Sequence, residues 1–226
     1  MIRPDLEKAL LEINMNLSNE CIQSFELFAA ELKKWNSKFN LTALCKDSDI
    51  AVKHIIDSLI FASNIAADES VMDIGSGAGM PSIPLKIVKP EVKVVSVDAV
   101  GKKIMFQRHV SRLLGMAEFE ALHARAESLH STYAGFFDVI TSRAFSRLDV
   151  FVAMAAPMLK SGGRMIAMKG PSAQSEIERA GDELCSLGFE ICSVESYSLP
   201  MEKGDRCLVT ISSVNAHKQG LCAGVL

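Results

Sequence analysis

Hydrophobic and polar positions follow two different periods along this chain. Between residues 5 and 66, apolar side chains recur every three or four positions, which is typical of one face of a helix. The spacing predicts helices over 5–13, 18–35 and 47–66. One apolar face of the second helix runs through Ile22, Phe25, Phe28, Ala29, Leu32 and Trp35. We therefore expect Trp35, the single tryptophan, to pack in the core rather than bind a ligand.

From residue 71 onward, short apolar runs alternate with helical stretches. The runs predict strands over 71–74, 92–98, 118–123, 136–142, 164–169, 189–197 and 206–213. The stretches between them predict helices over 81–88, 102–114, 148–159 and 174–187. Such alternation implies an α/β fold with a mostly parallel seven-stranded sheet and helices on both faces. Residues 214–226 show no period, and we expect them to form a loose tail.

A glycine turn follows the first predicted strand. That strand carries Asp73 near its end, and glycines occupy positions 75, 77 and 79. Glycine adopts backbone angles that a Cβ forbids, and it allows a ligand to approach the main chain closely. Asp98 ends the second predicted strand, 23 residues after Gly75. An acid at that place accepts hydrogen bonds from ribose hydroxyls, so the pattern indicates a nucleoside site.

The details of the turn favour one cofactor over another. The glycine spacing is G-x-G-x-G and not the dinucleotide pattern G-x-G-x-x-G. Asp73 directly before the turn suits a cationic amino group, whereas it would repel a pyrophosphate. The combination favours S-adenosylmethionine over NAD. A nucleotide-binding or NAD-dependent oxidoreductase is the competing interpretation from a different class.

Composition and charge narrow the function classes. The chain has 226 residues, of which 49% are hydrophobic, enough for one full domain and an extension. The net charge of −3 argues against bulk binding of nucleic acid but permits a local basic patch. Six cysteines lack C-x-x-C spacing, so we expect neither a metal site nor a disulfide. No apolar run reaches membrane-spanning length and no secretory signal is visible, so we expect a cytoplasmic protein.

Histidine and acid side chains recur within the third predicted helix. His54, Asp57 and Ser58 have the i, i+3 and i+4 spacing of one helix face. A pair of this kind is usually structural. No nucleophile is apparent beside it, so a hydrolytic triad is not expected.

Five segments together resemble a known family. They are N-L-T at 40–42, K-H-I-I-D-S at 53–58, D-I-G-S-G-A-G-M-P at 73–81, S-R-A-F at 142–145 and M-K-G at 168–170. In this order they resemble the bacterial 16S ribosomal RNA guanine-N7 methyltransferases, the glucose-inhibited division protein B family. The resemblance runs from about residue 34 to about residue 209. It implies a class I methyltransferase (Rossmann-like) domain over 67–213, preceded by a helical extension over 1–66.

The resemblance also implies roles for individual residues. It places Gly75 and Met80 at the methionine and ribose part of S-adenosylmethionine, and Asp98 at the ribose. The glycine turn adds Gly77 to the residues that we expect to bind the cofactor. Ala126 and Glu127 match the pair that meets the adenine, and Arg143 matches an arginine beside the cofactor. The acceptor implied is a guanine in a conserved loop of the small-subunit RNA. We expect no membrane partner, and we expect the protein to act as a monomer.

The inferred reaction determines which residues we expect on the acceptor side of the site. Guanine N7 has a lone pair and no proton, so its methylation needs no general base and no catalytic acid–base residue is expected. The reaction needs N7 held in line with the methyl group, and an environment that tolerates positive charge moving from sulfur to the purine. The N-P-P-Y type motif of amine methyltransferases is absent, and S-R-A-F stands in its place. We expect Arg143 and Lys169 on the acceptor side, and Phe145 either stacks on the target base or packs in the core.

RNA phosphates require cations outside the cofactor site. The candidates are Lys33, Lys34, Lys38, Lys46, Lys53, Arg147, Lys169 and Arg206. Because N7 lies on the major-groove edge, which side chains cannot easily reach in an RNA helix, we expect the guanine to lie in a loop or distorted region. A class I methyltransferase that acts on a small molecule or a protein would carry the same glycine turn and is the alternative within the fold.

Overall fold

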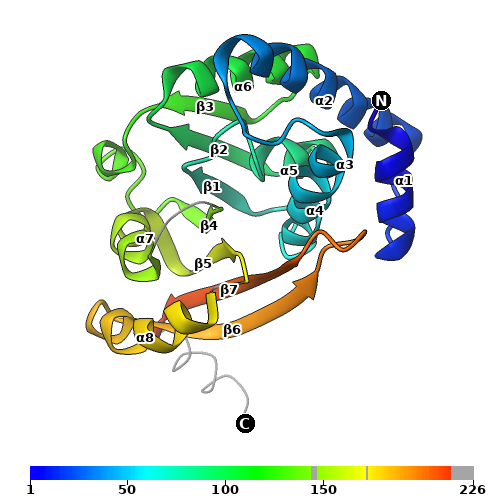
Figure 1. Ribbon diagram of the computed structural model, residues 1–226. Coiled ribbons are helices and arrows are strands. Elements are labelled where there is room, and N and C mark those ends of the chain that lie inside the picture. The colour runs from blue at the N-terminus through cyan, green and yellow to red at the C-terminus, as the bar shows by residue number, and fades with distance from the viewer. Residues whose placement is uncertain (144–146, 172, 215–226) are drawn as a thin grey trace, which may run out of the picture.

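A computed structural model describes residues 1–143, 147–171 and 173–214. They form a seven-stranded sheet in the order β3-β2-β1-β4-β5-β7-β6 (Figure 1). The strands are β1 (Ser70–Ile74), β2 (Lys93–Asp98), β3 (Phe119–His123), β4 (Phe137–Ser142), β5 (Leu159–Lys169), β6 (Phe189–Ser198) and β7 (Asp205–Ser213). The first five run parallel, and β7 lies antiparallel between β5 and β6. The expected mostly parallel α/β sheet is confirmed.

Helices cover both faces of this sheet (Figure 1). They are α1 (Arg3–Glu12), α2 (Asn19–Phe39), α3 (Asp47–Asp49), α4 (Asp57–Ala62), α5 (Ser82–Val88), α6 (Gly101–Leu113), α7 (Leu148–Ala155) and α8 (Ala173–Ser186). Three tighter or wider helical segments join them: η1 (Ile50–Ile56), η2 (Ala126–Leu129) and η3 (Ala156–Met158). The buried side chains of α4 and α5 pack on one face, and those of α7 and α8 pack on the other.

The N-terminal helices share a core with the part of the chain around the glycine turn. Phe25, Phe28 and Leu32 on α2 are fully buried in one cluster with Met80 and Phe106. The helix begins where the sequence predicts, because the Ser18 hydroxyl caps it by accepting a hydrogen bond from the Cys21 N–H at 3.2 Å. Trp35 contacts the Phe106 ring edge-on at a centroid distance of 5.7 Å. Its expected packing role is confirmed. The division at residue 66 stays a prediction.

Two predicted elements differ from the structure. The helix expected over 47–66 consists of three consecutive segments, α3, η1 and α4, and ends at Ala62. The middle segment, η1, is a π-helix. A π-helix closes its hydrogen bonds from i to i+5 and so widens the turn, and side chains three positions apart no longer share a face. The helix expected over 148–159 ends at Ala155, and Leu159 already opens β5 by pairing with Phe137 of β4. The continuous apolar run there does not reveal where helix gives way to strand.

The strand order puts a crevice at the carboxyl edge of β1 and β4. The chain moves outward from β1 to β2 and β3, and returns to the other side of β1 at β4. Open α/β sheets bind ligands at such a reversal of strand order. Asp73 on β1 lies opposite Thr141 on β4, and each stands two residues before a site feature, Gly75 and Arg143 respectively. In residues 1–143, 147–171 and 173–214, no helix is both long and apolar enough to cross a membrane. The tail expected over 214–226 lies outside the described residues, apart from Val214.

Candidate active site

The glycine turn is held by hydrogen bonds to the second strand. Gly75 and Gly77 have positive φ angles of 71° and 61°. The Gly75 N–H donates to the Val97 carbonyl at 2.9 Å, and the Gly77 N–H donates to Asp98 Oδ2 at 2.9 Å. A Cβ on Gly77 would meet nothing within 4 Å, so space is open in front of this main chain. A Cβ on Gly79 would stand 2.4 Å from Ile83 Cδ1, so this third glycine serves close packing of α5.

Asp98 lies at the end of β2 with both carboxylate oxygens engaged. Oδ1 accepts from the Val100 N–H at 2.8 Å, and Oδ2 accepts from the Gly77 N–H. The side chain is only 7% exposed, and the Lys103 ammonium is 3.8 Å from Oδ2. Each carboxylate oxygen has a further lone pair for a hydroxyl donor. Asp98 therefore fixes the turn and still offers acceptors at the place expected for a ribose.

Gln107 is a site residue that sequence reasoning missed. Its Nε2 donates to Ser76 Oγ and to the Gly77 carbonyl, both at 2.8 Å. Its Oε1 accepts from Ser96 Oγ at 2.5 Å, and Ser82 Oγ donates to Ser96 Oγ at 3.2 Å. This buried network ties α6, β2 and α5 to the turn. The signal that could have revealed it is a polar residue directly after Phe106, on the inward face of an amphipathic helix.

Two buried polar atoms lack partners among the described residues, both at the carboxyl edge of β1 and β4. Asp73 is fully buried, and its Oδ2 accepts from the Ser82 N–H at 3.3 Å. Its Oδ1, like Ser142 Oγ, has no such hydrogen-bond partner. Burial raises the pKa of the Asp73 carboxyl to about 7. An acceptor left open beside a glycine turn fits a ligand that brings a cationic donor.

The other expected cofactor residues lie around the same edge. Met80 is buried in the core cluster that contains α2. Ala126 is buried and begins η2, shortly after β3. Glu127 is exposed, and its side chain borders a hollow formed with α7 and α8 that includes His130 and Met154. Contacts of Met80, Ala126 and Glu127 with a cofactor stay predictions.

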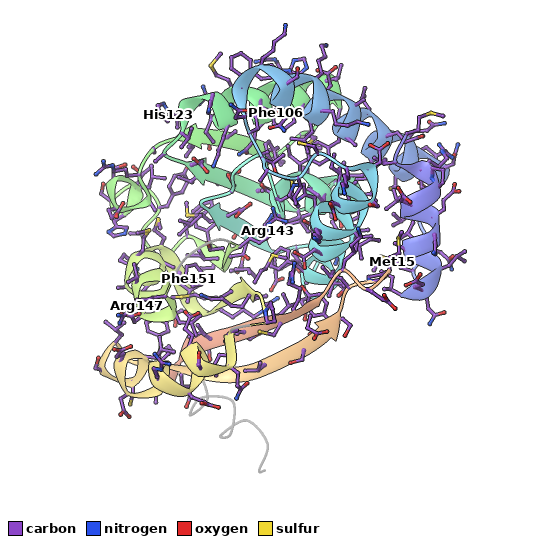
Figure 2. The ribbon with its side chains drawn as sticks, in the orientation of Figure 1. Met15, Phe106, His123, Arg143, Arg147 and Phe151 are labelled. Atoms are coloured by element: carbon purple, nitrogen blue, oxygen red, sulfur yellow. The ribbon has the colours of Figure 1, made fainter. Side chains whose placement is uncertain are left out.

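Arg143, the residue expected on the acceptor side, lies in the interior of the fold next to the end of β4 (Figure 2). Its Nη1 donates to the Lys53 carbonyl at 3.0 Å, and its Nη2 donates to His54 Nδ1 at 3.2 Å. Nη1 also lies 3.8 Å from Asp57 Oδ2. Burial lowers the pKa of the guanidinium, while the carboxylates of Asp57 and Asp73 oppose that shift. Arg143 thus links the end of β4 to the π-helix η1.

The contacts of His54 fix its protonation state. Arginine can only donate, so Nδ1 of His54 accepts and the ring is neutral with its proton on Nε2. Nε2 then donates to Thr42 Oγ1 at 3.1 Å. Burial and the charge of Arg143 lower the pKa of His54 to about 3. The ring is therefore a spacer between Thr42 and Arg143, and it stays uncharged near neutral pH.

Asp57 pairs with residues far along the chain and not with His54. Its Oδ1 accepts from the Tyr197 hydroxyl at 2.7 Å, and its Oδ2 faces Arg143. Ser58 Oγ donates to the His54 carbonyl at 2.6 Å. The side chains of His54 and Asp57 thus do not contact each other but both contact Arg143, and Ser58 bonds only to the main chain of its own helix. Tyr197 was missed, because only the pairing of β6 with β7 brings it over α4.

The candidate cations for RNA occupy different surroundings. Lys169 donates to both carboxylate oxygens of Glu176, at 2.8 and 3.0 Å, and its side chain is 9% exposed. Arg147 forms ion pairs with Asp149 and Glu183 at the surface. Other expected phosphate ligands are also paired: Lys33 with Asp47, Lys34 with Glu31 and Lys53 with Asp49. Their contact with RNA stays a prediction. Phe145 lies outside the described residues.

A hollow of about 460 Å³ opens beside Arg143. Its polar lining comes from η1, α4, the end of β4 and β7, and consists of Lys53, His54, Asp57, Arg143 and Arg206. No group of three or more metal-binding side chains occurs in the part of the chain that the structure describes. The site therefore offers a carboxylate-rich turn on one side and a cation-rich hollow on the other.

Comparison with known proteins places this chain in a family. Residues 21–206 match the family model of rRNA small subunit methyltransferase G. The chain is 49% identical to the ribosomal RNA small subunit methyltransferase G of Geobacter sp. (strain M21), over 91% of this chain and 95% of that protein. It is 47% identical to the protein of the same name from Geotalea uraniireducens (strain Rf4), over 90% and 93% of the two chains.

Solved structures support the fold. The TYW2 protein of M. jannaschii, solved in complex with AdoMet, matches with a TM-score of 0.57 and 15% identity, over 71% of this chain and 76% of that chain. A mutant of the 16S rRNA (adenine(1408)-N(1))-methyltransferase of Catenulisporales acidiphilia, solved with its cosubstrate SAM, matches with a TM-score of 0.52 and 16% identity, over 70% and 90% of the two chains. At these identities the likeness concerns the fold alone.

Proposed function

Because the chain belongs to the rRNA small subunit methyltransferase G family, we propose that it methylates N7 of a guanine in a conserved loop of 16S ribosomal RNA. Family membership makes it a ribosomal RNA methyltransferase, with S-adenosylmethionine as its methyl donor. The choice of guanine, of the N7 atom and of a loop is the proposal. The alternatives with an NAD cofactor or a small-molecule acceptor do not fit this membership.

The unpaired Asp73 Oδ1 is the observation that carries the cofactor assignment. S-adenosylmethionine has an ammonium group that would donate to this buried carboxylate and hold it ionised. Asp98 would accept from the ribose hydroxyls. The residues proposed to hold the cofactor are Gly75, Gly77, Met80, Asp98, Ala126, Glu127 and Arg143. When bound, the cofactor supplies an electrophilic methyl group on a sulfonium.

The acceptor side suits an atom that has no proton to lose. His54 uses both ring nitrogens in hydrogen bonds and stays neutral, so it is a poor proton acceptor. The Asp57 carboxylate already faces Tyr197 and Arg143. These residues position Arg143, and Arg143 would orient the guanine or its phosphate. The observation favours a ring nitrogen over an amine, whose methylation releases a proton.

The partners follow from the same proposal. We propose that the protein acts in the cytoplasm as a monomer on the RNA of the small ribosomal subunit. Lys169 would contact the RNA backbone only after it leaves Glu176, so we assign it a smaller part than Arg143.

Mass mapping of small-subunit RNA tests the proposal. RNA from a deletion strain should lack one methyl group on one guanine, and the purified protein with S-adenosylmethionine should restore it. The position of the methyl group is read by cleavage chemistry specific for 7-methylguanosine. A restored methyl group on adenine, on a guanine amino group or on a protein would reject the proposal.

A further inference from the structure

Two hollows meet at Arg206. The first, of about 460 Å³, is the one beside Arg143. The second, of about 480 Å³, lies over β6 and β7 and begins at α8. They share Gly170, Pro171 and Arg206, so they adjoin at these residues, and we call the two hollows together the groove. The polar lining of the second hollow includes the neutral side chains of Gln174, Ser196 and Ser198 and one carboxylate, Asp205, which accepts a hydrogen bond from Ser198 Oγ at 2.7 Å. A groove that continues past the reacting site suits a chain-like ligand.

The guanidinium of Arg206 has capacity for a further acceptor. Arg206 faces Tyr197 across the antiparallel pair of β7 and β6, on the side of the sheet covered by α4. Its one hydrogen bond to the described residues runs from Nη1 to the Asp205 carbonyl at 2.7 Å. An arginine has five N–H donors, so four remain for other partners or for water.

Like charges stand close together around the first hollow. Lys53, Arg143 and Arg206 line it with a single carboxylate, Asp57, which Tyr197 and Arg143 already engage. The charge of Arg206 further lowers the pKa of Arg143, as expected for two cations that repel each other. Lys53 is also drawn to Asp49, at 3.4 Å, outside the hollow. An anion between these cations relieves the repulsion, and a phosphate matches the planar fork of arginine.

We propose that Lys53, Arg143 and Arg206 bind the 5′ phosphate of the target guanosine; this rests on the function proposed above. In a nucleotide with its base in the anti conformation, the N7 and C8 side of a purine faces its own 5′ phosphate. A cation cluster that holds this phosphate therefore places N7 toward the same edge of the sheet. The neighbouring nucleotide on the 5′ side continues past Arg206 along the groove. Arg206 is a positioning residue for the reaction and not a proton-transfer group.

A single neutral phosphate in the RNA tests the subsite. The probe is 16S RNA assembled by ligation around a synthetic segment, with a methylphosphonate at the 5′ phosphate of the methylated guanine. A second RNA carries the same change three nucleotides farther along the strand. Single-turnover methylation is measured at subsaturating RNA with the wild-type protein, Arg206→Gln and Arg112→Gln. Arg112 is exposed on α6 and outside both hollows, so it controls for the loss of one positive charge.

The expected result is a coupling between one residue and one phosphate. The methylphosphonate at the target should slow the wild-type protein and Arg112→Gln about tenfold, as for loss of a charge-assisted hydrogen bond. Arg206→Gln should be slowed about tenfold on unmodified RNA, and the methylphosphonate should slow it further by a smaller factor than the wild type, because only Lys53 and Arg143 still contact the phosphate. The distant methylphosphonate should affect all three proteins alike. Equal sensitivity of all three to the target methylphosphonate would overturn the subsite.

Two controls keep the outcome clear. Arg206→Gln should keep the thermal unfolding temperature and the S-adenosylmethionine affinity of the wild-type protein, and Arg206→Lys replaces it as the test variant if it does not. Failure of the wild-type protein to form 7-methylguanosine on unmodified RNA would reject the proposed function itself. Normal formation of 7-methylguanosine, with no effect of the target methylphosphonate, would reject only the subsite.

Discussion

The two halves of the proposed active site are built by different means. The cofactor half is formed mainly by the stretch from β1 to α6, and it is held by main-chain N–H groups, the Asp98 carboxylate and the Gln107 amide. The acceptor half comes from distant segments that bring together Thr42, His54, Asp57, Arg143, Tyr197 and Arg206. Charged groups dominate it.

The sign of the charge also differs between the halves. The cofactor half presents carboxylates at Asp73 and Asp98, whereas the acceptor half presents cations at Lys53, Arg143 and Arg206. A sulfonium donor is a cation and RNA is a polyanion, so each half suits one of the two partners. The donor is thus recognised by local backbone geometry and the acceptor by long-range charge placement. Variants in the two halves should therefore fail in different ways.

The largest effect is expected at Arg143, where the halves meet. Arg143→Ala removes the links to the Lys53 carbonyl and to His54, and should slow methyl transfer about a hundredfold at saturating cofactor, the size typical of lost alignment. Single-turnover methylation of small-subunit RNA measures it. No new pH dependence should appear between about pH 5 and 9, because N7 has no proton to lose and burial still holds the pKa of His54 below its usual value.

The matched control for Arg143 keeps the charge but not the shape. Arg143→Lys cannot contact the Lys53 carbonyl and His54 together, so it should recover only part of the lost rate. Full recovery would mean that charge alone matters and that the double contact has no role.

Asp73→Asn should change cofactor binding and protein stability in opposite directions. It removes the carboxylate proposed to pair with the ammonium, so S-adenosylmethionine affinity should fall by roughly 1.5–3 kcal/mol, or about ten- to hundredfold. In the wild type the affinity should fall up to about tenfold per pH unit below pH 7, because the Asp73 pKa of about 7 must drop on binding. The variant should lack this pH dependence. Calorimetry between about pH 5.5 and 7.5 measures both.

The same substitution should stabilise the cofactor-free protein. A folded pKa raised from 3.8 to about 7 contributes stability below about pH 4 that is lost as the pH rises to 7. At pH 8 this pKa shift destabilises the folded protein by at most roughly 4 kcal/mol. Urea unfolding at about pH 5 and pH 8 should show Asp73→Asn gaining on the wild type as the pH rises. A variant less stable than the wild type at pH 8 would show that the Asp73 carboxylate has a further stabilising partner.

Asp98→Asn should have a smaller effect that remains in the cofactor half. An asparagine keeps one acceptor for the Val100 N–H but loses the acceptor for the Gly77 N–H. We expect S-adenosylmethionine affinity to fall by about 1–2 kcal/mol, with the RNA affinity unchanged. Calorimetry measures the S-adenosylmethionine affinity, and filter binding measures the RNA affinity. A loss of RNA affinity with normal cofactor affinity would mean that Asp98 belongs to the acceptor half instead.

The smallest effect is expected at Lys169. Its ammonium must leave Glu176 to reach a phosphate, so Lys169→Gln should weaken RNA binding only about twofold to threefold and slightly flatten the salt dependence. Glu176→Gln is the matched variant, because it frees the lysine and should strengthen RNA binding by a similar factor. If neither changes the salt slope, Lys169 serves only the packing of α8 on β5.

The sequence predicts the two halves unequally, for a physical reason. Glycine spacing, Asp73 and Asp98 follow local rules of a strand, a turn and a helix, and the structure brings them together as expected. The partners of Arg143 cannot be read in this way, because they depend on β6 folding over α4 and on a π-helix that redirects His54. The hydrophobic period likewise gives no sign that Leu159 begins a strand, because the strand forms only by pairing with Phe137 of the neighbouring strand β4.

One measurement addresses the central claim most directly. Small-subunit RNA from a deletion strain is incubated with the purified protein and S-adenosylmethionine carrying a deuterated methyl group, and nucleosides and fragments are analysed by mass. The account predicts the label in 7-methylguanosine at one position only. Arg143→Ala should lower the labelling rate at every cofactor concentration, whereas Asp73→Asn should lower it only when the cofactor is scarce. Label in any other nucleoside, or in 7-methylguanosine at many positions, would contradict the account.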